Sequence, residues 1–336
     1  MPKDNENIRL PLLGPVEPSE PHGFTAEQMI RCDECLRANP PTRINCLYCS
    51  VPLPMTEASA RLRKPILRKP EKHQLGYNTI LLPKEQTFSA EAIAEAAALL
   101  KLKDEELQRI LNERVPLPLA RTASREEAEL VHDRLHALGF EVVTLVDEGA
   151  VKRVRSISFD ESRFAFNAGH AKDELEDLWS NIVLLVPARL IARRVEVKEL
   201  KTRHAENHIL DTSEFFSDEA MIDLYTATSS ETLRISAGSF DFSCLGAEKT
   251  LIAGQNIARL QRWLAAKAPN ARLDESYNRL RPLLDLVWGA EQETQSSGWR
   301  RERPGKLSIA MATIESNESQ FTRYSRLLYY LTTHPR

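Results

Sequence analysis

Residues 32–49 read CDECLRANPPTRINCLYC and hold four of the five cysteines of this 336-residue chain. The cysteines form two Cys-x-x-Cys pairs, Cys32/Cys35 and Cys46/Cys49, joined by an arm of ten residues. Four thiolates delivered in this way match the tetrahedral preference of structural zinc, and a complete set of protein ligands leaves no position for water or substrate. We therefore predict one structural Zn²⁺ per chain, bound by these four cysteines, with no catalytic role.

The zinc ion is expected to fold residues 30–54 as a separate module. A segment of about twenty residues buries too little apolar surface to fold alone, and zinc binding supplies roughly 10–16 kcal/mol. The alternative is two disulfides or four free thiols. Because the N-terminus lacks a basic region followed by an apolar one, no signal peptide is expected, and disulfides would not persist inside a cell.

The module resembles two related families of small zinc domains. One is the bacterial zinc ribbon at the head of many multidomain proteins, in which Cys-x-x-Cys and an Asn-Pro precede Cys-x-Tyr-Cys and a Pro-Leu. The other is the Ran-binding-protein type of zinc finger, whose framework is met by Cys32, Cys35, Asn39, Cys46 and Cys49. The resemblance covers residues 30–54 and implies the metal site.

The ligand signatures of the Ran-binding-protein family are broken in this chain. Members of that family bind single-stranded RNA by stacking an aromatic between bases beside paired arginines, or bind ubiquitin through a Thr-Phe pair. Here Pro40 replaces the aromatic, Arg43 stands alone, and Leu36-Arg37 replaces Thr-Phe. The resemblance therefore carries over the metal and not the ligand.

Length and composition set the class of the whole chain. At 336 residues two or three domains are expected, and 42% hydrophobic and 28% charged residues are ordinary for a soluble globular protein. A formal net charge of -3 argues against a nucleic-acid surface over the whole protein. No apolar run approaches the roughly 18 residues of a membrane span. We expect a cytoplasmic, bacterial, multidomain α+β protein without a transmembrane segment.

Two segments beside the zinc module are expected to lack regular structure. Residues 1–29 contain five prolines and scattered acids, which favours flexibility. Residues 55–75 form a linker, in which residues 61–72 carry six basic residues, one acid and two prolines that prevent a continuous helix. This basic linker either contacts RNA or an anionic membrane surface, or is a solvated connection between domains.

Residues 76–149 are predicted to form a compact domain with the order β-α-α-β-α-β. Ser124 and Glu127 form a capping box at the start of the third helix, and Gly139 ends it. The expected elements are strands at Tyr77–Leu82, Val115–Ala120 and Glu141–Val146, and helices at Ala90–Leu100, from Asp104 and from Ser124.

This order, together with TASREEAELVHDRLHALGFEVVTL at residues 122–145, resembles the fold shared by the C-terminal domain of the ribosomal stalk protein and the ClpS adaptor. The stalk domain recruits translation factors, and the adaptor delivers proteins with destabilising N-termini to a protease. The adaptor holds its substrate's α-amino group with an Asn-Asp-Asp turn after the first strand. The corresponding turn here is Pro83-Lys84-Glu85-Gln86, so the resemblance implies the fold and a generic binding role. The alternative is a packing unit without a ligand.

Residues 150–269 are predicted to form an antiparallel, barrel-like β domain closed by a helix at about residues 252–266. The outline resembles a pleckstrin-homology domain, and WSNIVLL at residues 179–185 is similar to a strand entry of such bacterial domains. These barrels bind phosphoinositides or peptides. Arg189, Arg193 and Arg194, at strand spacing, are either part of such a site or a solvated face. Cys244 has apolar neighbours and is expected to be a buried thiol.

Residues 270–336 are predicted to be a helical accessory tail. Helices are expected at residues 274–288 and 320–331, with a strand at residues 307–314 and a basic loop at residues 298–306. Trp299 and the three arginines that follow it are the best nucleic-acid or phosphate candidate by composition, although arginine against an aromatic is also ordinary loop packing.

The chain contains no P-loop, G-x-S-x-G, H-E-x-x-H or dinucleotide glycine motif. His204 and His208 have helical metal-ligand spacing in polar surroundings and are interpreted as surface residues. No catalytic or cofactor-binding residue is therefore predicted. The predicted function is that of a non-enzymatic zinc-binding adaptor or scaffold with an unidentified protein partner. The alternatives are an RNA- or ribosome-associated factor that uses the zinc module and the basic linker, and an unrecognised hydrolase.

Overall fold

The computed structural model describes residues 24–56, 59, 75–84, 87–147, 149–168, 174–202, 208–296, 298, 300–303 and 306–334. The chain divides into two compact units, Met1–Lys64 and Pro65–Arg336. The basic stretch predicted at residues 61–72 and most of the N-terminal segment predicted to be flexible lie outside the described residues. Among the described residues, no helix combines the length and the apolar character that crossing a membrane requires.

In the N-terminal unit, the structure describes three short elements: η1 (Ala26–Gln28), β1 (Ile30–Arg31) and β2 (Ala38–Asn39). β1 and β2 pair antiparallel, with Ile30 opposite Asn39. Among the described residues of this unit, the core cluster consists of four buried apolar side chains, Ile30, Cys32, Cys46 and Leu53. So small a core cannot fold the unit by hydrophobic burial.

In the described part of the second unit, residues 77–146 come first and have the order β-α-α-β-α-β. The elements are β3 (Tyr77–Leu81), α2 (Ala90–Leu100), α3 (Asp104–Asn112), β4 (Leu117–Thr122), α4 (Arg125–Ala137) and β5 (Val142–Val146). The strands form an antiparallel sheet in the order β4-β3-β5. Helix α4 begins where the sequence predicts, because the Ser124 side chain accepts a hydrogen bond from the Glu127 N–H, and positive-φ Gly139 follows its end.

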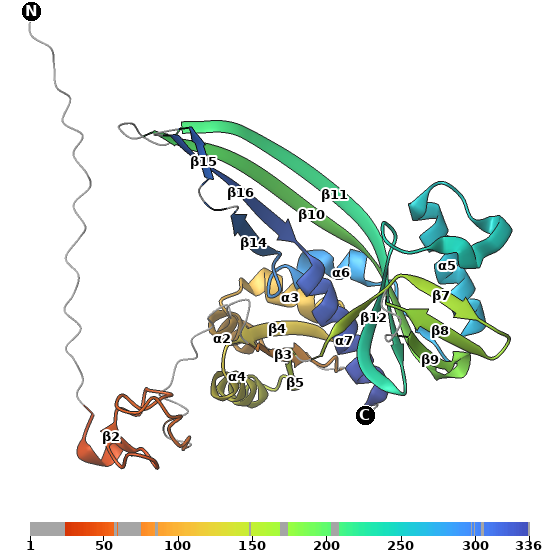
Figure 1. Ribbon diagram of the computed structural model, residues 1–336. Coiled ribbons are helices and arrows are strands. Elements are labelled where there is room, and N and C mark those ends of the chain that lie inside the picture. Colours follow the sequence, from red (N-terminus) through yellow and green to blue (C-terminus); the bar gives the residue numbers. More distant parts are fainter. Residues whose placement is uncertain are drawn as a thin grey trace, which may run out of the picture. The chain divides into compact units, whose positions relative to one another are not determined.

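A large sheet that curls into a half-barrel dominates the rest of the unit (Figure 1). Its strands run in the order β14-β16-β10-β11-β12-β6, β13 pairs with β10, and β15 pairs with β16. The bounds are β6 (Val151–Val154), β10 (Ile182–Thr202), β11 (His208–Thr226), β12 (Ser229–Ser236), β13 (Arg272–Leu273), β14 (Glu291–Ser296), β15 (Arg300–Arg303) and β16 (Lys306–Ser316).

The base of this sheet is buried on both faces. On one face, Leu184 and Met221 pack with the β3–β5 segment and with α6 (Tyr277–Leu284) and α7 (Glu318–Thr333). On the other face, Leu185 and Leu224 pack with a second group of elements. That group consists of β7 (Ser156–Phe159), β8 (Arg163–Asn167), β9 (Glu174–Leu178), η2 (Trp179–Asn181), η3 (Phe242–Glu248) and α5 (Ala253–Lys267). Because neighbouring residues of a strand point to opposite faces, one pair of strands supports both cores.

The first core crosses the domain boundaries predicted after residues 149 and 269. Buried side chains from Ile80 in β3 to Leu328 in α7 belong to one cluster. The C-terminal segment predicted to be a helical tail contributes four strands, β13 to β16, to the large sheet, and Arg300–Arg303, predicted in a loop, is strand β15. The helix predicted at residues 274–288 is shorter, since α6 ends at Leu284.

The distal halves of β10 and β11 extend beyond both cores, as Figure 1 shows. There β10 pairs with β11 on one side and with β16, from Ala192 to Thr202, on the other. We call this part of the sheet the arm.

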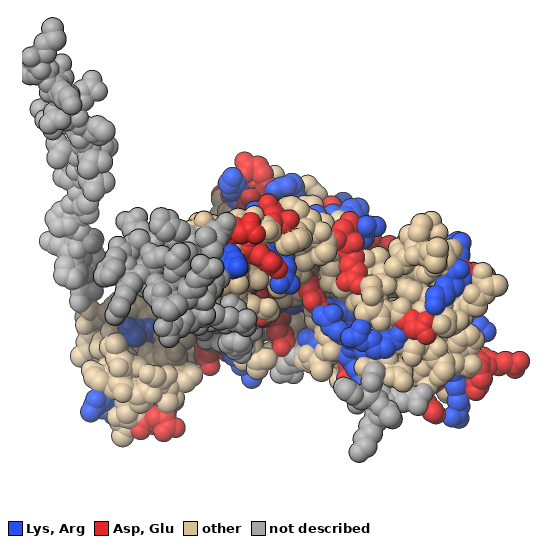
Figure 2. All heavy atoms as spheres, turned by 45° about the horizontal axis from the view of Figure 1, so that its top comes forward, with Lys and Arg blue, Asp and Glu red and all other residues tan. Residues whose placement is uncertain are grey.

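On the face shown in Figure 2, basic and acidic side chains are interspersed, in keeping with the small net charge.

Candidate metal centre and a buried ion network

The four predicted ligands lie together in the N-terminal unit. The Sγ atoms of Cys32, Cys35, Cys46 and Cys49 all lie within 4.8 Å of one another. Cys32 Sγ is 3.6 Å from Cys49 Sγ, and Cys35 Sγ is 3.5 Å from Cys46 Sγ. Tetrahedral zinc with Zn–S bonds of about 2.3 Å places its sulfurs roughly 3.8 Å apart. The thiols are therefore spaced to hold a metal ion of this kind.

Each Cys-x-x-Cys pair turns its two sulfurs inward with the same backbone geometry. The Leu36 N–H donates to the Cys32 carbonyl at 2.9 Å, and the Ser50 N–H donates to the Cys46 carbonyl at 3.0 Å. Leu36 and Ser50 follow the second cysteine of their pairs and have φ of 59° and 62°. This left-handed conformation is unusual for residues other than glycine, so the turns are held by the rest of the site.

Asn39 connects the two cysteine pairs from a fully buried position. Its Nδ2 donates to the Arg37 carbonyl at 2.9 Å and lies 3.4 Å from Cys46 Sγ. Its Oδ1 accepts a hydrogen bond from the Leu47 N–H at 2.8 Å. The buried amide therefore orients both pairs, as outer-sphere partners of metal ligands do.

The surroundings of Cys46 favour its thiolate. Burial raises the pKa of this thiol, but the backbone N–H groups of Tyr48 and Cys49 donate to the sulfur, and the net effect lowers the Cys46 pKa to about 6. The Tyr48 nitrogen lies 3.4 Å from the sulfur. At Cys35 and Cys49 backbone hydrogen bonds lower the pKa, but burial and the neighbouring thiols outweigh them and raise it, so Cys46 ionises more readily than either of these thiols without a metal. The thiolate is the form that binds a metal.

The surface of the module carries apolar side chains beside an arginine. Leu36, Leu47 and Tyr48 are each at least half exposed. The Arg37 guanidinium lies over the Tyr48 ring, 4.7 Å from its centroid, so one face of this aromatic is already covered.

A second polar cluster, in the other unit, was not predicted from the sequence. Arg234 on β12 and Asp223 on β11 form a bidentate ion pair with bonds of 2.7 and 2.8 Å, and both side chains are fully buried. Arg234 also donates to Glu318 at 3.0 Å and to Thr322 at 2.9 Å, both on α7.

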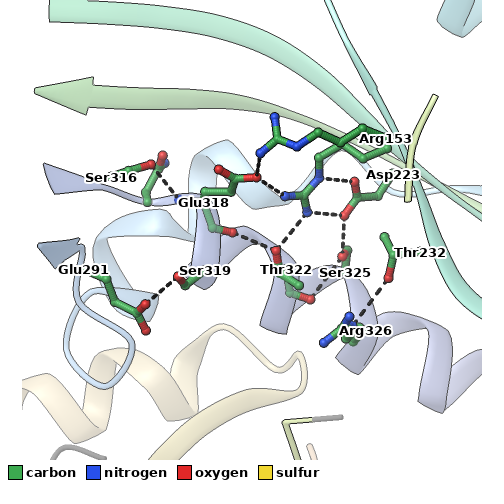
Figure 3. Close-up of polar contacts among 12 residues, drawn as sticks. Arg153, Asp223, Thr232, Glu291, Ser316, Glu318, Ser319, Thr322, Ser325 and Arg326 are labelled. Carbon is green, nitrogen blue, oxygen red and sulfur yellow. Dashed lines mark hydrogen bonds and ion pairs between the residues drawn. The ribbon is translucent and has the colours of Figure 1, made fainter. Parts of the chain in front are cut away.

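The network continues along α7. The Ser325 hydroxyl donates to Asp223 at 2.7 Å and lies 2.8 Å from the Tyr225 hydroxyl, to which Thr232 donates. Glu318 accepts a second bond from Arg153 of β6, as Figure 3 shows. The Asp223–Arg234 pair is hydrogen-bonded to side chains of α7, and these bonds continue to side chains of the sheet. We therefore interpret the network as the polar contact that holds α7 against the sheet.

A weak sequence signal marks the central pair. Asp223 is the one acid in the apolar run MIDLY, and Arg234 is the one base in TLRIS. A charge inside a buried strand requires a partner, and Asp223 lies directly opposite Arg234 in the ladder.

Other candidates from the sequence are placed as follows. Cys244 is half-buried against the second core, where burial raises its pKa to about 11. The three arginines at strand spacing, Arg189, Arg193 and Arg194, pair with Asp218, Glu214 and Glu196 on the sheet. His204, the side chain of His208, Trp299 and the side chains of Arg300, Arg301 and Arg303 lie outside the described residues.

The turn after β3 borders a pocket of about 380 Å³ that also contacts α2 and α3. Its lining includes Pro83, Lys84, Phe88 and Leu111. Lys84 lies 3.6 Å from Glu141, so this lysine and this acid of the lining are paired. Glu85 and Gln86 of the predicted turn lie outside the described residues.

Comparisons with family models, with curated proteins and with solved structures find no match to this chain.

Proposed function

We propose that the N-terminal unit is a structural zinc module. The observation that carries the proposal is the cluster of four cysteine sulfurs within 4.8 Å, on two turns with the same hydrogen-bond pattern and similar φ angles. A Cys₄ set fills the coordination sphere of Zn²⁺, so the ion would supply the folding free energy that so small a hydrophobic core cannot.

The whole chain is then a zinc-binding adaptor or scaffold that acts through protein contacts. The exposed Leu36, Leu47 and Tyr48 favour this function, because several exposed apolar side chains on so small a module are candidates for a protein interface. As part of the same proposal, residues 76–149 are a domain of the ribosomal stalk or ClpS type. Residues 150–269 are a domain of the pleckstrin-homology type. The RNA-associated and hydrolase alternatives stay predictions from the sequence.

Affinity purification of the tagged full chain from its own host, with and without nuclease, tests the adaptor function. We expect a protein partner in stoichiometric amount that survives nuclease and is lost in Leu47→Asp. Leu36→Asp asks whether the exposed side chain next to the Cys32/Cys35 pair also contacts the partner. Glu34→Gln, a change near Leu36 that keeps the apolar side chains, is the matched control. Co-purified RNA that nuclease removes, or the absence of any partner, contradicts the adaptor function.

A further inference from the structure

Within the part of the chain that the structure describes, no strand pairs with the outer edge of the arm. β11 pairs with β12 only from Met221 onward, and among the described residues nothing but β10 pairs with residues 209–218. Figure 1 shows β11 as the outermost strand of the arm. We call residues 209–218 the β11 edge. An edge of this length offers a row of unused backbone donors and acceptors to another strand.

The hydrogen bonds of neighbouring residues show which N–H and C=O groups of the β11 edge point away from β10. The Ala220 carbonyl accepts from the Ala237 N–H at 3.0 Å, so Ala220 directs its backbone away from β10. The β10–β11 register is regular from Ala220 to Asp211, and backbone direction alternates along a strand. The outward groups therefore belong to Thr212, Glu214, Phe216 and Asp218.

The β11 edge carries two consecutive exposed aromatics. Phe215 and Phe216 are 53% and 71% exposed. As neighbours on a strand they point to opposite faces, so a strand added at this edge would contact both rings. Natural proteins protect long edges with charged side chains, above all lysine, and with proline; residues 209–218 contain acids but no lysine and no proline.

Charge selects the kind of strand that fits. Residues 209–218 contain three acids, Asp211, Glu214 and Asp218, and no lysine or arginine. Arg193 and Arg189 of β10 pair with Glu214 and Asp218, whereas Asp211 has no ion-pair partner among the described residues. An added strand with basic residues opposite these acids would gain cross-strand attraction.

The same acids argue against a second copy of this chain. If two copies paired antiparallel through this edge, residues opposite each other would lie on the same face of the joined sheet. The register that places Phe216 opposite Phe216 of the second copy also places Glu214 opposite Asp218. The register that stacks Phe215 on its copy places Asp211 opposite Glu219. Like charges directly opposite are destabilising.

We propose that the β11 edge binds an extended basic segment of a partner protein by adding it as an antiparallel strand. This inference rests on the adaptor function and names the chemistry of its partner. Affinity would come from the outward backbone groups of Thr212 to Asp218, and selectivity from the two phenylalanines and the acids.

The test uses the full chain and the peptide acetyl-KTVVKTTK-amide. Paired antiparallel with residues 211–218, it places lysines opposite Asp218, Glu214 and Asp211, and valines opposite Phe216 and Phe215. Thr212→Pro removes one outward N–H while leaving the β10 ladder intact, and Thr212→Val is the matched control that retains it. We expect saturable binding that Thr212→Pro weakens about tenfold and Thr212→Val leaves unchanged.

The outcomes separate this inference from the zinc proposal. Cys46→Ser should bind the peptide like the wild type, because the arm belongs to the other unit. The charge-reversed peptide acetyl-ETVVETTE-amide should not bind. Equal affinity of both peptides, equal affinity of Thr212→Pro and Thr212→Val, or no binding overturns the proposal. A dimer in sedimentation that Thr212→Pro abolishes also overturns it, because a second copy would then occupy the edge.

Discussion

Asp223 and Arg234 face each other across the β11–β12 ladder and form a bidentate ion pair without solvent exposure. Two charges out of water are costly unless each remains fully bonded, and here serine, threonine and glutamate side chains of α7 complete the set. The pair therefore couples α7 to strands β11 and β12 of the large sheet.

Arg234→Ala is expected to destabilise the second unit strongly, because it leaves the Asp223 carboxylate buried and unpaired. Breaking such a pair costs about 3–5 kcal/mol. Urea denaturation measures the change. Arg153→Ala, which removes the half-exposed partner of Glu318, is the control and should cost about 0–1 kcal/mol. Similar losses in the two variants would mean that the buried pair has no special role.

Ser124→Ala is expected to weaken the start of α4. The substitution removes the acceptor of the Glu127 N–H and should cost about 0.5–2 kcal/mol. Hydrogen exchange at the Glu127 amide and urea denaturation measure the effect. Glu129→Ala, which loses only an exposed pair with Arg125, should cost no more than about 0.5 kcal/mol. Unchanged exchange at Glu127 would show that Ser124 does not cap the helix.

Glu291 should contribute stability that acid removes. Burial raises the pKa of this carboxyl, but hydrogen bonds from Ser319 and Arg323 outweigh it and hold the pKa below its usual range. The contribution is therefore complete above the pKa of the unfolded state and is lost as pH falls through the lower folded-state pKa. Urea midpoints between about pH 7 and pH 3 should fall less steeply in Glu291→Gln than in the wild type. Glu293→Gln, exposed on the same strand, controls for the loss of one acid, and identical slopes in all three proteins would refute the role of Glu291.

The pocket beside Lys84 should not capture free N-termini. An α-ammonium group leaves water only for anionic or several strong acceptor partners, and Lys84 repels it while pairing with Glu141. Peptides beginning with Leu, Phe, Trp or Tyr are expected to bind no better than their acetylated forms in a fluorescence titration. Micromolar binding that acetylation abolishes would instead support a protease adaptor like ClpS.

The features that the sequence predicted correctly are those that depend on residues close together in the chain. The four cysteines lie within eighteen consecutive residues, and the start of α4 depends on contacts three residues apart, so spacing and residue type were sufficient. The Asp223–Arg234 pair depends on the register of two strands, which the alternation of apolar residues does not specify.

The shared core was missed for the same physical reason. Arg194 pairs with Ile314 in the large sheet, across more than a hundred residues of sequence, so the C-terminal strands cannot be assigned to it from local patterns. The boundaries predicted after residues 149 and 269 rested on changes in local pattern, while the packing of α7 against β3, β10 and α6 joins the segments.

The zinc content of the purified full chain tests the central claim most directly. Elemental analysis together with native mass spectrometry should find one Zn²⁺ per wild-type chain and none in Cys46→Ser. In that variant residues 30–54 should lose protection from hydrogen exchange, while residues 77–333 keep it because they have their own cores. A wild-type chain that contains no metal yet keeps residues 30–54 ordered would contradict the account, as would a Cys46→Ser chain that retains its zinc.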